Sequence, residues 1–212
     1  MSRKKLKVGI IAAEHSGDRL GANLLRSLKN LDEVEIFGLG GPQVNSLGIS
    51  TPDGVNHQDL QVMGLVDPLL KLPKLLSIRK KLFTLFSNDK IDILVDLSGH
   101  TGKNRLLVFA QKPAPIQVTW LGYPNTTGLS AIDYRFTDII ADPIGEADEL
   151  HSEKLLRLPN GFQCFQGNEK ILVGLELPQK SQGYITFGSF NNLSKITPQV
   201  IKAWSKILHM VP

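Results

Sequence analysis

Apolar positions along this chain alternate between short continuous runs and longer stretches with helical spacing. The runs are rich in β-branched residues and predict strands at 7–12, 34–39, 91–97, 116–121, 133–140 and 154–158. Helical spacing from Leu20 to Leu31, and short apolar segments at 43–47 and 106–111, predict helices between them. Strands that alternate with helices favour an α/β fold with a Rossmann-like parallel sheet.

The run at 91–97 is too continuously apolar for a half-exposed strand and is typical of a strand buried on both faces of a parallel sheet. It leads into a loop of small residues and one imidazole, Ser98-Gly99-His100-Thr101-Gly102. Open α/β sheets bind ligands at the carboxyl ends of their strands. A second glycine-bracketed loop, 122–128, follows the strand at 116–121, so the two loops predict a crevice at one edge of the sheet.

The turn after the first strand carries Ser16, Gly17 and Asp18. Ser16 or Asp18 can cap the next helix, and the residues alone favour this interpretation as a cap and a turn. The alternative is a substrate-binding turn, because strand, polar turn and helix follow one another as in a nucleotide-binding fold. The three-glycine dinucleotide fingerprint is absent from this turn.

An amphipathic helix is predicted over residues 69–86, with Leu69 and Phe86 among its apolar positions and Pro73 near its start. One interpretation is a surface helix that packs on the sheet and keeps its basic face in solvent. The other is an interfacial helix that touches anionic lipid, which would give the protein a peripheral membrane contact.

The composition changes after the last predicted strand. Residues 163–183 are rich in Gln, Gly, Lys and Pro and predict a linker between a first domain, 1–162, and a second α/β domain. Residues 184–212 supply the start of that second domain: a strand at 184–190, a loop at 191–195, and a helix that begins at Thr197-Pro198.

Composition and charge narrow the class of protein. Apolar content of 42%, charged content of 21% and a net charge of +4 are ordinary for a soluble globular protein and do not indicate nucleic acid as a partner. The single cysteine, Cys164, cannot form an internal disulfide. Neither a membrane span nor the apolar core of a signal peptide is recognisable, so we expect a cytoplasmic location, with peripheral contact at the inner membrane left open.

Two family resemblances meet in the strand at 91–97. Residues from about 91 to 212 resemble the catalytic region of the O-linked N-acetylglucosamine transferase and SPINDLY family, through DILVDLSGHTGKNRLLVFAQKPAPIQVTWLGYPNTTGLSAIDYRFTD, HSEKLLRLPNGFQCF and ITFGSFNNLSKITPQVIKAW. Residues from about 7 to 92 resemble the N-terminal domain of lipid-A-disaccharide synthase, through AAEHSGDRLGANLLRSL, GLGGPQVNSLG and LQVMGLVDPLLKLPKLLSIRKKL. The chain therefore looks like a chimera with a seam near 91–98.

Both resemblances imply a glycosyltransferase-B architecture with two facing nucleotide-binding domains, inverting chemistry, a UDP-linked glucosamine-type donor, and no required metal or cofactor. The first implies transfer from UDP-N-acetylglucosamine to a protein Ser or Thr hydroxyl. The second implies a lipid sugar acceptor. With only the start of a second domain, the chain is expected to be inactive or nearly so alone. A third interpretation is a non-enzymatic sugar-binding or interaction module.

The resemblances also assign roles to single residues. Lys195 matches a lysine that contacts the donor diphosphate, and Asn191 and Asn192 lie where polar residues approach the nucleotide. Ser98 aligns with the aspartate base of the lipid family. Because a serine without an adjacent base is a poor proton acceptor at neutral pH, it counts against the lipid chemistry.

Other loop residues keep two interpretations. His100 is either a catalytic group that binds sugar or moves a proton, or a hydrogen-bonding loop residue. Gly99 lets the backbone approach a ligand. Tyr123, Asn125 and Thr126 either line the acceptor side or shape their own loop.

Overall fold

The computed structural model describes residues 5–12, 15–31, 33–49, 72–102, 104–164, 174 and 176–211. The chain divides into two compact units, residues 1–164 and 165–212, and each is described by itself. The first three positions of the helix predicted at 69–86 lie outside the described residues.

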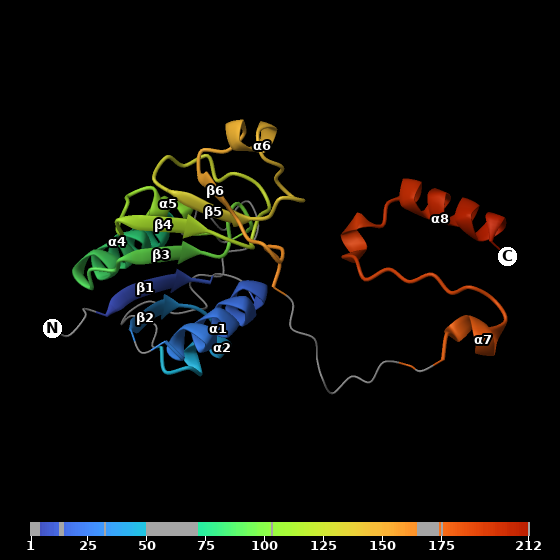
Figure 1. Ribbon diagram of the computed structural model, residues 1–212, viewed down its shortest axis with the longest axis horizontal. Helices are drawn as coiled ribbons and strands as arrows, with labels where there is room; N and C mark the ends of the chain where they lie inside the picture. The colour runs from blue at the N-terminus through green and yellow to red at the C-terminus, as the bar shows by residue number, and fades with distance from the viewer. Residues whose placement is uncertain are drawn as a thin grey trace. The chain divides into compact units, whose positions relative to one another are not determined.

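The first unit is built on a six-stranded parallel sheet with the order β2-β1-β3-β4-β5-β6 (Figure 1). The strands are β1 (Leu6–Ile11), β2 (Val34–Leu39), β3 (Ile93–Asp96), β4 (Ile116–Thr119), β5 (Tyr134–Thr137) and β6 (Lys154–Arg157). The predicted α/β fold with a parallel sheet is confirmed. All six carboxyl ends lie at one edge, because every pairing is parallel.

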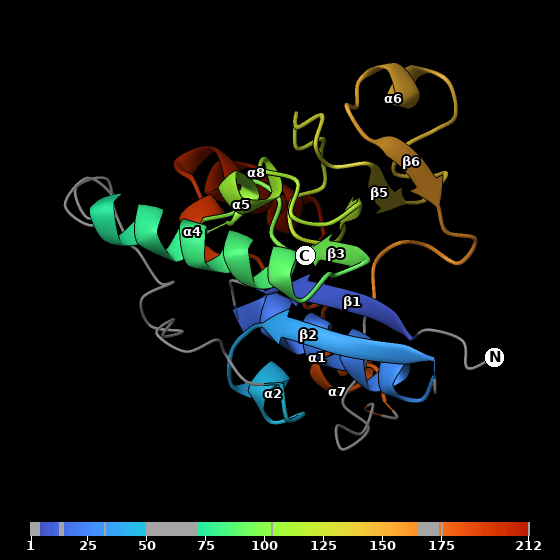
Figure 2. The ribbon, with the colours of Figure 1, turned by 90° about the vertical axis from the view of Figure 1, so that its left-hand side faces the viewer.

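Helices cover both faces of this sheet, as Figures 1 and 2 show from two directions. The helices are α1 (His15–Lys29), α2 (Pro42–Asn45), α4 (Leu72–Asn88) and α5 (Leu106–Phe109), with α6 (Glu146–Glu149) in the connection between β5 and β6. On one face, Leu25 of α1 belongs to a buried cluster with Ile10 and Val95. On the other face, Leu82 and Phe86 of α4 are fully buried in a cluster with Leu94.

The two faces of the sheet therefore carry separate cores, each built by alternate residues of the same strands. Burial of Leu82 and Phe86 agrees with the interpretation of α4 as a helix packed on the sheet. The helix begins at Leu72, so Pro73 lies in its first turn, where no intrahelical hydrogen bond is lost.

The N-terminal cap predicted for α1 is wrong. The helix begins at His15, so Ser16 and Asp18 lie inside its first turn. The buried carboxylate of Asp18 instead accepts hydrogen bonds from the backbone N–H groups of Gln43 (2.9 Å) and Val44 (3.0 Å), at the start of α2. Asp18 thus satisfies the free N–H groups of another helix rather than of its own.

β5 is shorter than the strand predicted at 133–140. The carboxylate of Asp138 accepts hydrogen bonds from the backbone N–H groups of Ile140 (2.9 Å) and Ala141 (2.8 Å), which turns the chain away from the sheet. Short polar side chains stabilise turns in this way, and the turn ends the strand at Thr137.

The second unit contains α7 (Pro178–Gln182), the 3-10 helix η2 (Leu193–Lys195) and α8 (Pro198–Met210). The hydroxyl of Thr197 caps α8 by accepting from the N–H of Val200 at 3.4 Å, as predicted. The predicted strand at 184–190 is wrong: this segment is extended but has no strand partner in the described part of the chain. A strand needs such a partner, because its backbone groups bond only across to a neighbour.

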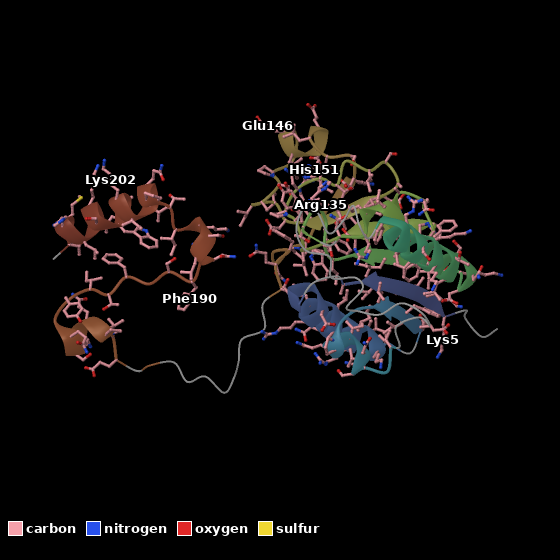
Figure 3. All side chains as sticks on the ribbon, turned by 180° about the vertical axis from the view of Figure 1, so that it is seen from behind. Lys5, Arg135, Glu146, His151, Phe190 and Lys202 are labelled. Carbon is pink, nitrogen blue, oxygen red and sulfur yellow. The ribbon has the colours of Figure 1, made fainter. Side chains whose placement is uncertain are left out.

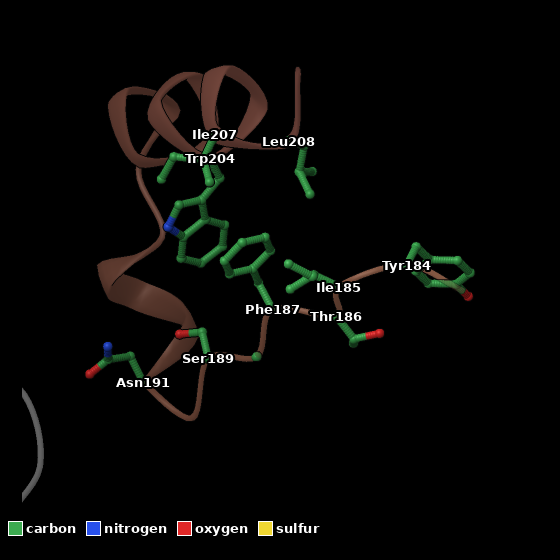
Figure 4. A pocket seen from close by; sticks show the side chains of 10 residues that line it. Tyr184, Ile185, Thr186, Phe187, Ser189, Asn191, Trp204, Ile207 and Leu208 are labelled. Carbon is green, nitrogen blue, oxygen red and sulfur yellow. The ribbon is translucent and has the colours of Figure 1, made fainter. Parts of the chain in front are cut away.

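A hollow of about 620 Å³ lies between this extended segment and α8. Figure 4 shows Phe187 turned toward Trp204 and Ile207, which project from α8. Phe187 remains 55% exposed, so the hollow is only partly covered. Within the ranges that the structure describes, no helix has the length and apolar character needed to cross a membrane.

Candidate functional site

The carboxylate of Asp96, at the end of β3, organises the loop that follows. It is fully buried and accepts hydrogen bonds from the backbone N–H groups of Ser98 (3.1 Å) and Gly99 (2.9 Å). Its Oδ2 also accepts from the hydroxyl of Thr119 at 2.9 Å, which ties the end of β3 to the end of β4. Burial raises the pKa of Asp96, and the three hydrogen bonds only partly oppose that effect.

The loops after β3 and β4 touch backbone to backbone. Gly99 has φ of +52°, and a Cβ atom there would lie 2.8 Å from the Cβ of Tyr123. A Cβ at Gly122 would lie 2.4 Å from the carbonyl carbon of Ser98. We call residues 97–102 and 121–128 the loop pair. The two predicted ligand loops are therefore neighbours in space, and glycine permits their contact.

The ring of His100 bridges the loop pair. Its Nε2 lies 2.9 Å from the carbonyl oxygen of Thr127, and its ring meets that of Tyr123 edge-on, with centroids 5.8 Å apart. A carbonyl oxygen can only accept, so Nε2 must carry the proton in this bond. In the neutral ring, Nδ1 is then the only acceptor.

Glu153, directly before β6, holds the far end of the loop pair. Its buried carboxylate accepts from the hydroxyl of Thr126 (2.8 Å), the N–H of Thr127 (2.8 Å) and the hydroxyl of Thr127. Burial acts to raise the pKa of Glu153, but the hydrogen bonds from Thr127 and Thr126 outweigh it and hold the pKa below its ordinary value. Glu153 is therefore a carboxylate at neutral pH.

Arg135, in β5, bonds to the backbone of the loop at 121–128. Its guanidinium is buried and donates to the carbonyl oxygens of Tyr123 (3.1 Å) and Asn125 (3.0 Å). Asp142 lies 3.6 Å from Arg135 and 3.8 Å from the ring of His151, and Figure 3 labels both of these residues. The backbone of the predicted acceptor residues is thus fixed by a charged group from the next strand.

The substrate-binding residues predicted in the first unit differ in whether their side chains bond within the protein. Gly17 lies near Leu97, the residue after β3, because a Cβ atom added to Gly17 would lie 3.6 Å from the carbonyl oxygen of Leu97. Ser16 is exposed beside it. Asp18 faces α2, and the side-chain oxygen of Asn125 accepts from the N–H of Thr126 at 2.8 Å. Asp18, Asn125 and Thr126 therefore all use their side chains within the protein.

Ser98 differs from these residues because its hydroxyl has no partner in the part of the chain that the structure describes. The side chain is 2% exposed, and within the described residues its Oγ makes no hydrogen bond. An unpaired buried hydroxyl carries a desolvation cost that a bound polar group can remove. Its neighbour Thr101 donates its own hydroxyl to the carbonyl oxygen of Ser98 at 2.8 Å.

The second unit contains the residues predicted to contact the nucleotide donor. Asn192 caps η2, because its side-chain oxygen accepts from the N–H of Ser194 at 3.1 Å. Asn191 lines the hollow beside α8. Lys195 ends η2, is exposed, and its ammonium makes no hydrogen bond or ion pair in the described ranges. Lys195 is therefore available to an anion just before α8.

Five residues that organise the site were not identified from the sequence: Asp96, Thr119, Thr127, Arg135 and Glu153. A usable signal was present for two of them. Asp96 and Arg135 are charged residues inside apolar strand runs, where a charge requires partners. In the described part of the chain, no cluster of three His, Cys, Asp or Glu side chains is arranged to hold a metal ion.

Comparison with known proteins gives one consistent family. Residues 1–174 match the family model described as Glycosyl transferase family 41, so one family spans the position where the two resemblances meet. A tomato (Solanum lycopersicum) protein named as a probable UDP-N-acetylglucosamine–peptide N-acetylglucosaminyltransferase SPINDLY is 53% identical over 133 residues, which cover 63% of this chain and 14% of the relative. A barley (Hordeum vulgare) protein of the same name is 54% identical over 133 residues, with the same coverage.

Two further matches extend over nearly the whole chain. The Arabidopsis thaliana protein SEC, named as a probable transferase of the same kind, is 30% identical over 99% of this chain and 21% of its own length. The structure of an O-GlcNAc transferase mutant from Thermobaculum terrenum matches with a TM-score of 0.71 at 29% identity, covering 98% of this chain and 37% of that one. The chain thus spans a minor part of the length of each relative.

Proposed function

Because this chain belongs to glycosyl transferase family 41, we propose that it forms part of an inverting hexosaminyltransferase that moves N-acetylglucosamine from UDP to a Ser or Thr hydroxyl of a peptide. The observation that carries the proposal is the exposed ammonium of Lys195, which has no partner among the described residues and lies just before the first turn of α8. The family resemblance implies that this lysine contacts the diphosphate of the donor.

The chemistry requires positive charge where UDP departs. The acceptor oxygen forms a bond to the anomeric carbon while the bond from that carbon to the diphosphate oxygen breaks. Negative charge then develops on the phosphate oxygens, and a fixed ammonium beside free helix N–H groups stabilises it. The hydroxyl proton must pass to a base, and the Nδ1 acceptor of His100 is our candidate for it.

Replacing Lys195 with alanine should weaken binding of UDP by about tenfold or more, because a charge-assisted hydrogen bond to phosphate is lost. Calorimetric titration of the chain with UDP and UDP-N-acetylglucosamine measures this. The matched control is Lys202→Ala, which removes an exposed lysine from the body of α8 and should leave the affinity unchanged.

GDP serves as the nucleotide control in the same titrations. Equal or tighter binding of GDP would contradict the assignment of a UDP-linked donor. An unchanged UDP affinity in the Lys195 variant would remove this residue from the donor site. A complete lack of nucleotide binding would favour the alternative that is not an enzyme, a sugar-binding or interaction module.

Transfer to a lipid sugar, as in lipid-A-disaccharide synthase, and contact of α4 with a membrane stay predictions. Leu82 and Phe86 face the core and Lys80 is exposed, so within the described side chains of α4 it is the basic side that is open to anionic lipid. Sedimentation with vesicles that contain anionic lipid, compared with neutral vesicles, tests the contact. Equal recovery of the chain with both kinds of vesicle would oppose it.

A further inference from the structure

The peptide group between Thr127 and Gly128 connects Glu153 to the ring of His100. Its N–H, from Gly128, donates to the hydroxyl oxygen of Thr126 at 3.0 Å. Its carbonyl, from Thr127, accepts from Nε2 of His100 at 2.9 Å. A peptide group is planar, so whatever fixes the direction of the N–H also fixes the direction of the carbonyl.

The hydroxyl of Thr126 is itself fixed by the carboxylate of Glu153. It donates to Oε2 of Glu153 at 2.8 Å and accepts from the N–H groups of Gly128 and Ser152, the latter at 3.2 Å. The other carboxylate oxygen accepts from both the N–H and the hydroxyl of Thr127. The two carboxylate oxygens of Glu153 thus hold Thr126 and Thr127, the two residues that precede Gly128, through hydrogen bonds.

We propose that Glu153 is a positioning residue for His100: it fixes the peptide group between Thr127 and Gly128, whose carbonyl keeps the proton on Nε2 and leaves Nδ1 as acceptor. The ring is also set edge-on against Tyr123. The inference rests on the proposed function in one respect: that function identifies the group that Nδ1 would contact as a hydroxyl of the sugar or of the acceptor. The charge on Glu153 is essential, because only a carboxylate accepts at both oxygens.

The test is the exchange of the imidazole proton on Nε2 of His100, followed by nuclear magnetic resonance at about pH 8.5, where an ordinary imidazole is neutral. In the unmodified chain we expect a protected proton bonded to Nε2, together with a close contact between the rings of His100 and Tyr123. Glu153→Gln should make the exchange at least tenfold faster and weaken the ring contact, because one acceptor oxygen becomes a donor. Glu149→Gln, in exposed α6, is the matched control and should change neither.

A second variant keeps the test decisive if Glu153→Gln does not fold. Thr126→Val preserves the shape of the side chain and the bonds from Thr127 to Glu153, but removes the hydroxyl that receives the Gly128 N–H. It should release the His100 proton in the same way. A proton that stays protected in the folded variants, or one that is unprotected in the unmodified chain, overturns the proposal. No nucleotide is present, so these outcomes are independent of whether the chain binds UDP.

Discussion

Replacing Gly122 with alanine will force the loop pair apart and destabilise the first unit by several kcal/mol. The added Cβ would lie 2.4 Å from the carbonyl carbon of Ser98 and 2.5 Å from its Cα and its oxygen. Overpacking costs about 1–3 kcal/mol when side chains can adjust, and more here because the opposing atoms are backbone. Urea denaturation, monitored by tryptophan fluorescence to which Trp120 of this unit contributes, measures the loss.

The matched control is Gly17→Ala, in the same unit. Gly17 lies inside α1, and among the described residues outside its own helix no atom would lie closer than 3.6 Å to its Cβ. Alanine should there be neutral or stabilising by up to about 1 kcal/mol, since glycine is a poor helix former. If both variants unfold at the same urea concentration as the unmodified chain, the tight contact between the loops is incorrect.

Replacing Asp96 with alanine should destabilise the first unit by about 3 kcal/mol or more. The substitution leaves two backbone N–H groups and the hydroxyl of Thr119 without an acceptor, in surroundings from which water is excluded. Asp96→Asn keeps the shape of the side chain and one acceptor oxygen, so its loss should be smaller. Chemical denaturation of both variants measures the difference, and equal losses would contradict the role of the hydrogen bonds.

The asparagine variant also predicts a pH dependence. Burial raises the pKa of Asp96 in the folded chain, so folding favours the neutral acid. The stabilisation that the neutral Asp96 side chain contributes is fully present below the pKa of this group in the unfolded chain, about 3.9. It is lost as the pH rises through the pKa of Asp96 in the folded chain. The stability advantage of the unmodified chain over Asp96→Asn should therefore decrease as the pH rises from about 4. An advantage that grows with pH would contradict this.

The sequence was sufficient to predict the sheet because apolar runs specify strands through local pattern alone. The runs around Val95 and Val118 predicted β3 and β4, and their adjacency predicted that the loops with His100 and Tyr123 are neighbours. The run at 184–190 has the same pattern but forms no strand, because strand formation also needs a partner that the pattern does not reveal.

The supports of the loop pair could not be predicted because they join residues far apart in the chain. Glu153 bonds to Thr126 and Thr127 from 26 or 27 positions away. The four-residue helix α6, which lies in the acidic stretch before Glu153, has too few residues for a periodic pattern. The predictions for Lys195 and Asn192 depended on a family resemblance rather than on a physical pattern.

The strand order has a consequence for how the protein acquires its fold during synthesis. After β1 and β2 pair, the strands β3, β4, β5 and β6 each add next to β1 or to the strand made just before them. Each of these strands can therefore pair with a strand that the ribosome has already made. The sheet can grow in the order of translation, because no strand has to wait for a partner that is made later.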